Sequence, residues 1–124
     1  MTSNSLVTLH DVPVLYCAPE GPLLDGEGAA LDLIGDALGQ GAELVAVPVE
    51  RVADAFFRLR SGVAGAVTQK FVNYRLRLAI VGDVSHHVEK STALRDLLRE
   101  ADRGGSLWFV PDRDGLEARL APGR

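Results

Sequence analysis

Three short, mostly apolar runs, each followed by a proline or a glycine, constrain the fold of this chain most strongly. They cover residues 44–47, 76–81 and 107–110. Apolar runs of this length are typical of strands that are covered on both faces of a sheet. Segments with helical periodicity separate the runs, which indicates parallel strands joined by right-handed crossovers. The sequence therefore predicts an α/β fold.

The segments before the first and second runs are both predicted to contain a helix. Asp25 is the expected N-cap of the first helix, and residues 39–41 mark its end. Ser61 and Gly62 open the second helix, after a short irregular or helical segment over residues 54–59. In the first helix, Leu31, Ile34 and Leu38 form the stripe expected to face the core, and Ala30 and Ala37 widen it. In the second helix the core-facing residues are expected to be Val63, Val67, Phe71 and Tyr74.

Two short strands over residues 5–17 precede these segments. His10 and Asp11 form a two-residue polar turn between the strands, which predicts a hairpin at the edge of the sheet. Leu6 is expected to point inward. The antiparallel hairpin makes the predicted sheet mixed, and its edge strand offers a place where a second copy of the chain could pair to form a homodimer.

The last third of the chain is predicted to contain a polar loop and two helices. The loop covers residues 84–90, and Ser91 or Thr92 caps the helix that follows. Gly104 and Gly105 are expected to end that helix, and residues 112–120 are expected to form a short terminal helix. The complete predicted order is β-β-α-β-α-β-α-β-α.

Length and composition place the chain among globular proteins. Residues 1–124 are predicted to form a single α/β domain, with a mixed, mostly parallel sheet flanked by helices. A net charge of −4 argues against nucleic-acid binding, which usually needs a basic domain. No apolar run approaches about 18 residues and no signal peptide is recognisable, so we expect a cytoplasmic protein without a membrane segment. Cys17 has no internal disulfide partner and is expected to be a small buried residue.

Side chains that can bind ligands follow the predicted parallel strands. In open α/β sheets, ligands gather beyond the carboxyl ends of such strands. Glu50, Asp83 and Asp112 follow the three predicted parallel strands, so we expect them at one edge of the sheet, which we call the rim. The helix that opens at Ser61 begins near the same rim with Arg60 beside it, and its N-terminal N–H groups favour negative charge. These five residues form the predicted binding or regulatory site.

The loop after Asp83 is the alternative candidate site. It contains Ser85, His86, His87 and Glu89, which are residue types used in acid–base and metal chemistry. Adjacent histidines usually point in different directions, and a His-x-x-x-His spacing is absent. A zinc site needs further ligands that the sequence does not identify. We therefore assign no catalytic residue, metal or cofactor, and we expect an interaction role in preference to catalysis.

The run Ser61-Gly62-Val63-Ala64-Gly65 resembles the phosphorylatable serine turn of STAS domains, the sulphate-transporter and anti-sigma-factor-antagonist modules. The predicted order of strands and helices also resembles theirs over nearly the whole chain. The resemblance implies a STAS-like fold and phosphorylation of Ser61 by an anti-sigma-type kinase, which switches partner binding. It also implies a protein partner, either an anti-sigma-like regulator or the kinase itself.

A closer similarity links the runs VPVERV, FVNYRLRLAIVGD, STALRDLLRE and SLWFVPD to a bacterial family known only as a domain of unknown function. This similarity implies no particular activity.

Two functional hypotheses follow. The first is a non-enzymatic regulatory or protein-interaction module that acts through the rim around Ser61. The second is a small-molecule-binding protein, or an enzyme that uses the loop from Asp83 to His87. A deep apolar pocket at the rim favours the second hypothesis, and a shallow, exposed surface favours the first.

Overall fold

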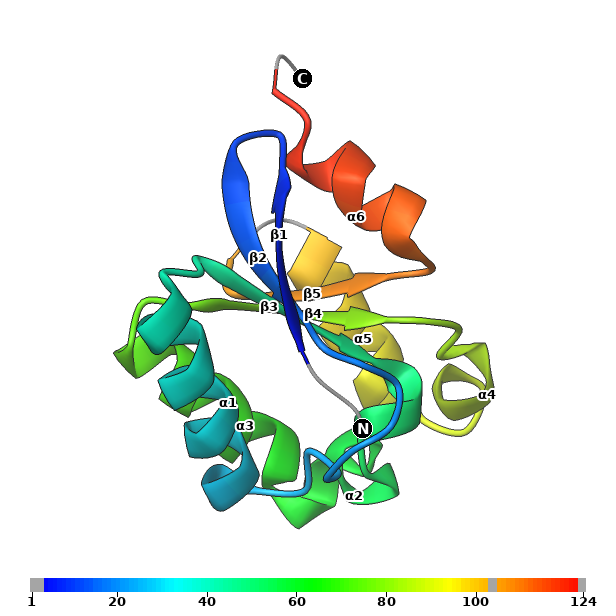
Figure 1. Cartoon of the computed structure of the whole chain (residues 1–124). Helices are drawn as coiled ribbons and strands as arrows, with labels where there is room; N and C mark the ends of the chain where they lie inside the picture. The colour runs from blue at the N-terminus through cyan, green and yellow to red at the C-terminus, as the bar shows by residue number, and fades with distance from the viewer. Residues whose placement is uncertain (1–3, 103–104, 123–124) are drawn as a thin grey trace.

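The computed structural model describes residues 4–102 and 105–122, which build one five-stranded sheet with helices on both faces (Figure 1). The strands are β1 (Ser5–Leu9), β2 (Val12–Tyr16), β3 (Leu44–Pro48), β4 (Arg77–Val81) and β5 (Leu107–Val110). The longer helices are α1 (Glu27–Gln40), α3 (Val63–Asn73), α5 (Thr92–Asp102) and α6 (Arg113–Leu120). The predicted α/β fold with a mixed sheet is therefore confirmed.

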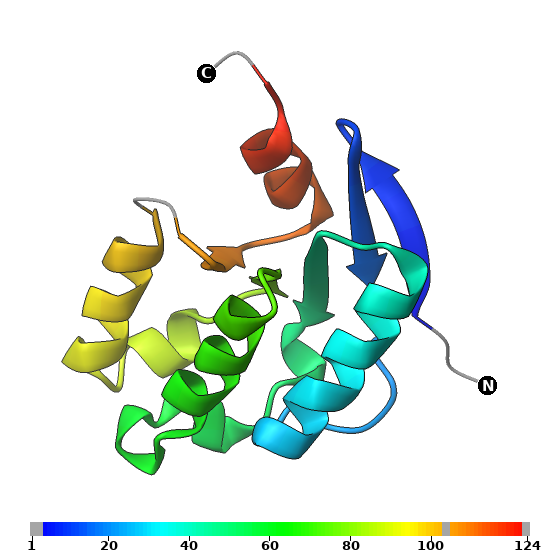
Figure 2. The ribbon, with the colours of Figure 1, turned by 90° about the vertical axis from the view of Figure 1, so that its left-hand side faces the viewer.

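The strands lie in chain order across the sheet, from β1 at one edge to β5 at the other. β1 is antiparallel to β2, and β2 to β5 are parallel to one another. His10 and Asp11 have φ values of 50° and 67°, as a tight two-residue hairpin turn requires. Because the parallel strands follow one another without a reversal of order, α1, α3 and α5 lie on one face of the sheet, and α6 lies on the other (Figure 2).

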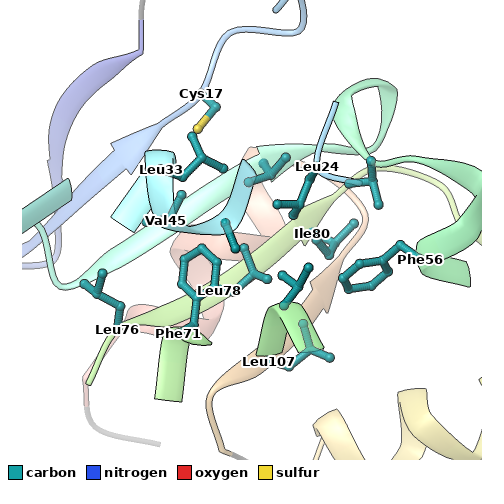
Figure 3. Packing of buried hydrophobic residues seen from close by; sticks show 14 of the residues in the cluster. Cys17, Leu24, Leu33, Val45, Phe56, Phe71, Leu76, Leu78, Ile80 and Leu107 are labelled. Atoms are coloured by element: carbon teal, nitrogen blue, oxygen red, sulfur yellow. The ribbon is translucent and has the colours of Figure 1, made fainter. Parts of the chain in front are cut away.

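Alternate residues of the central strands point to opposite faces, and both sets are apolar. The face below α1, α3 and α5 forms the larger core, which includes Leu15, Val45, Leu78, Ile80 and Leu107 together with Phe56 and Phe71 (Figure 3). The opposite face packs Val14, Leu44, Ala79 and Trp108 against Leu116 of α6. This arrangement explains why the strand sequences are continuously apolar, as predicted for strands covered on both faces.

The buried face of α1 agrees only in part with the sequence prediction, which placed Ala30, Ile34 and Ala37 correctly. Gly26 is the N-cap in place of Asp25, and no side chain caps this helix. Leu31 and Leu38 are 40% and 49% exposed. The buried residues are Ala30, Leu33, Ile34 and Ala37. The predicted stripe was therefore too wide, because packing against the sheet and α3 buries its side with the smaller alanines and leaves Leu31 and Leu38 exposed.

Two other side chains also point away from their predicted positions. Leu6 is 42% exposed, because Val7 and Leu9 are the residues of β1 that turn toward the core. Tyr74 is 47% exposed, because α3 ends one residue before it and the helical period no longer sets its direction. The inward positions predicted for Leu6 and Tyr74 are therefore wrong.

Four short helical segments add detail that the predicted order lacked. They are η1 (Val49–Arg51), α2 (Asp54–Phe57), η2 (Leu59–Ser61) and α4 (Ser85–Val88). α4 replaces most of the polar loop predicted over residues 84–90. Gly104, which was expected to end α5, lies outside the described residues. Among the described helices, none is both long and apolar enough to cross a membrane.

Candidate functional site

The structure divides the five predicted site residues among three hollows. Arg60 and Ser61 line a groove between η2 and the segment that leads from α4 into α5. Glu50 and Asp112 line a second hollow at the carboxyl ends of the parallel strands. Asp83 lines a third hollow, beside α4.

We name the first of these the cationic groove. It encloses about 720 Å³ and is lined by Phe57, Arg58, Leu59, Arg60, Ser61, His87, Lys90, Ser91, Thr92 and Ala93. Arg58, Arg60 and Lys90 are all exposed. No Asp or Glu belongs to this lining, and in the described part of the chain the three cations form no ion pair. The lining of the groove is therefore positively charged, and Asp54, which acts electrostatically on His87, lies outside this lining.

Ser61 lies in the wall of the cationic groove, where η2 passes into α3. Its hydroxyl group donates a hydrogen bond to the carbonyl oxygen of Ala55 at 2.5 Å and accepts one from the N–H of Val63 at 3.2 Å. Gly62 has a φ of 79°, a left-handed conformation that glycine adopts at little cost. Through these two hydrogen bonds the hydroxyl group of Ser61 helps to hold the start of α3. Ser61 is nevertheless exposed at the surface.

His87 contributes an aromatic surface to the same groove. Its ring stacks on Phe57, with the centroids 4.0 Å apart and the planes 10° from parallel. Burial and then repulsion from the neighbouring His86 lower the pKa of His87, and Asp54 acts in the opposite direction. The neutral imidazole is therefore favoured near pH 7, and its ring packs on the buried ring of Phe57.

The remaining residues of the alternative candidate site do not converge. The Oδ1 atom of Asp83 accepts a hydrogen bond from the N–H of Ser85 at 2.9 Å, and hydrogen bonding by Ser85 lowers the pKa of Asp83. His86 lies with Nε2 3.5 Å from Nζ of Lys90. Glu89 is exposed and outside the cationic groove. In the described ranges, no group of three or more His, Cys, Asp or Glu side chains is arranged to hold a metal ion.

We name the second hollow the rim hollow. It encloses about 630 Å³ and is lined by Ser5, Val7, Tyr16, Cys17, Ala18, Pro19, Pro48, Glu50, Val81, Gly82, Asp112 and Arg113. The guanidinium carbon of Arg113 lies 5.4 Å from the centroid of the Tyr16 ring. The pKa of Tyr16 is raised, mainly because the side chain is partly buried. The charge of Arg113 lowers this pKa, whereas the charges of Asp112 and Glu50 raise it. Two carboxylates and one guanidinium group therefore influence the ionisation of the same tyrosine side chain.

Sequence reasoning missed several residues of these two hollows. It assigned Ser61 and His87 to separate candidate sites, although they line one groove. Lys90 and Phe57 were not singled out, because nothing in their local sequence indicates that α2, α4 and the start of α5 meet. Tyr16 carried a detectable signal, since it ends β2 and lies at the carboxyl ends of the parallel strands.

The comparison with protein families gives one match. The family described as Domain of unknown function (DUF4180) matches residues 9–120, which include the whole lining of the cationic groove. The similarity to a family of unknown function that the sequence indicated is therefore confirmed. No curated protein and no solved structure matches the chain significantly.

Proposed function

The chain belongs to the DUF4180 family, and we propose that it is a non-enzymatic regulatory module that binds another protein through the cationic groove. The alternation of strands and helices supports the further proposal that its fold is STAS-like. In this proposal, phosphorylation of Ser61 switches partner binding, and the partner is an anti-sigma-like regulator or a kinase.

One observation carries the proposal, namely the position of Ser61 among cations. Its exposed hydroxyl group lies in the wall of a groove that Arg58, Arg60 and Lys90 line from two different segments. A phosphate group on Ser61 would add about 1.5 to 2 negative charges immediately before the N-terminus of α3. Positive side chains and helix N–H groups both favour a negative charge at this position.

Phosphorylation would also change the hydrogen bonds of Ser61. A kinase would transfer the terminal phosphoryl group of ATP to Oγ, with release of ADP and of the hydroxyl proton. The oxygen would then have no hydrogen to donate to the carbonyl group of Ala55. The modification would therefore alter both the charge of the groove and the attachment of η2 to α2.

The first experiment measures modification of Ser61 in cells of the native host. Tryptic cleavage after Arg60 and Lys70 releases the peptide 61–70, in which Ser61 and Thr68 carry the hydroxyl groups. We expect this peptide to carry one phosphoryl group in the wild-type protein and in Thr68→Val, and none in Ser61→Ala. Absence of phosphate from the peptide under all growth and stress conditions would contradict the proposed switch.

The second experiment measures the effect of charge at Ser61 on partner binding. Proteins that co-purify with the tagged wild-type chain are quantified against those that co-purify with Ser61→Asp and with Ser61→Ala. We expect Ser61→Asp to change the amount of a specific partner and Ser61→Ala to retain it. Identical partner profiles for all three proteins would contradict a switch at this residue.

The rim hollow favours a second candidate function, the binding of a small molecule. Its volume lies within the range of about 300–1,000 Å³ that is typical of ligand pockets, and it occupies the carboxyl ends of the parallel strands. Tyr16, Glu50 and Arg113 offer an aromatic face and both signs of charge. A metabolite that raises the melting temperature of the wild type but not of Glu50→Gln would support this function, and a screen without such a metabolite would contradict it.

A further inference from the structure

The cationic groove has the opposite charge to the chain as a whole. The chain carries a net charge of −4, yet the groove gathers Arg58, Arg60 and Lys90 without an Asp or Glu in its lining. Arg58 and Arg60 come from the segment around η2, whereas Lys90 follows α4. Exposed cations of a folded domain are usually interspersed with carboxylates, whereas these three line one groove from two segments. The charge is therefore complementary to an anionic occupant.

The groove also contains apolar surface, which restricts the kind of anion that fits. The half-buried ring of His87 stacks on the buried ring of Phe57, and the half-buried Leu59 lines the same groove. An inorganic anion would satisfy the cations but would leave this surface uncovered. A chain that alternates carboxylates with an aromatic or aliphatic side chain would contact both parts of the groove.

We propose that the cationic groove binds an acidic peptide segment of a protein partner, in which Asp or Glu side chains pair with Arg58, Arg60 and Lys90. An aromatic or aliphatic side chain of the same segment covers the half-buried side chains of His87 and Leu59. This inference rests on the proposed function, because it names the chemistry of the partner that the groove receives. The volume of about 720 Å³ accommodates a few side chains, which suits a short linear segment.

The experiment selects ligands without knowledge of the partner. A library of random twelve-residue peptides is displayed on phage and selected on the complete wild-type chain, and the enriched peptides are then synthesised. We expect the enriched peptides to carry at least three Asp or Glu residues near one aromatic or aliphatic residue. Their affinity should fall at least tenfold when sodium chloride is raised from low to high concentration, because exposed charges are screened by salt.

A pair of charge-reversal variants locates the binding. Arg60→Glu combined with Lys90→Glu reverses one cation on each side of the groove, and we expect it to weaken the enriched peptides at least tenfold. Lys70→Glu combined with Arg75→Glu makes the same change in net charge outside the groove, and we expect wild-type affinity. Urea denaturation of both double variants verifies that they are folded before affinities are compared.

Three results would overturn the inference. The first is enrichment of neutral or basic peptides, and the second is equal affinity of acidic peptides for both double variants. The third is a failure to enrich peptides, combined with sedimentation of the wild type, but not of the groove variant, with phosphatidylserine vesicles. That third result would assign the groove to an anionic lipid surface.

The outcome for Ser61 separates this inference from the proposed function. If acidic peptides bind in the groove and both Ser61→Asp and Ser61-phosphorylated protein bind them as the wild type does, the inference stands and the switch fails. If neutral peptides are enriched and phosphorylation of Ser61 changes their affinity, the switch stands and the acidic partner fails.

Discussion

The guanidinium group of Arg51 donates a hydrogen bond to Oδ1 of Asn4 at 3.1 Å, although the two residues are far apart in sequence. The same side chain donates to the carbonyl oxygens of Pro22 at 3.1 Å and Ala18 at 3.3 Å. Arg51 is only 6% exposed and its guanidinium fills the space beside Gly21. Arg51 therefore holds together the N-terminal segment and the loop after β2, which borders the rim hollow.

Replacement of Arg51 by Met should lower the free energy of unfolding by about 2–4 kcal/mol. The variant keeps much of the side-chain volume but removes the donors that satisfy two carbonyl oxygens and the Asn4 amide oxygen. Urea denaturation measures the change. Arg58→Met is the control, because Arg58 is exposed and its replacement should cost less than about 0.5 kcal/mol. Equal losses in the two variants would contradict a bracing role for Arg51.

Gly82 and Gly35 should respond in opposite directions to replacement by Ala. Gly82 has a φ of 142°, and a Cβ atom there would lie 2.5 Å from Cγ1 of Val49. We expect Gly82→Ala to destabilise the protein by roughly 2–4 kcal/mol through strain and overlap. Gly35 lies within α1 with open space around the position of a Cβ atom, so Gly35→Ala should stabilise by about 0.5–1 kcal/mol. Urea midpoints that move in the same direction would contradict this prediction.

The thiol of Cys17 should be protected from alkylation in the folded protein. Cys17 is 1% exposed, and burial raises the pKa of its thiol to about 11. Because the thiolate is the reactive form, only about 0.1% of the native thiol is reactive at pH 8. Alkylation by iodoacetamide, followed by mass spectrometry, should therefore be at least ~100-fold slower in native protein than in concentrated guanidinium chloride. Comparable rates in the two states would show that Cys17 is accessible.

Local sequence was sufficient to predict the strands and one helix of this fold. β3 was predicted correctly because all five of its residues are buried, so its apolar run needs no knowledge of the rest of the chain. α5 has a single apolar stripe, which begins at Leu94. The hydroxyl group of Ser91 accepts a hydrogen bond from the N–H of Leu94, as predicted for an N-cap residue. In α1 both Leu31 and Ala30 were expected to face the core, and only tertiary packing determines that Ala30 is buried and Leu31 is exposed.

The two hollows depended on contacts that sequence alone does not specify. Ser61 and His87 share a groove because successive crossovers place η2 beside the segment that leads into α5. The backbone N–H of Ser85, at the start of α4, donates a hydrogen bond to Asp83, and α4 places the His87 ring on Phe57. The rim itself was predictable from topology, since Glu50 and Asp112 follow parallel strands and do line one hollow.

Titration of His87 should make the stability of the protein depend on pH. Burial lowers the pKa of His87 in the folded protein below its value of 6.5 in an unfolded chain. Below that value the unfolded state binds more protons at this site than the folded state, so the free energy of unfolding decreases as the pH falls. The loss begins near 6.5 and is complete once the pH lies below the folded pKa of His87.

His87→Phe tests the origin of this pH dependence, because phenylalanine keeps a ring against Phe57 and cannot be protonated. Urea denaturation at about pH 7.5 and about pH 5 should show a smaller loss of stability in the variant than in the wild type. NMR titration of the His87 ring measures its pKa directly, and the midpoint should lie below 6.5. A midpoint at or above 6.5, or equal losses in both proteins, would mean that the stacked imidazole is not held in its neutral form by burial.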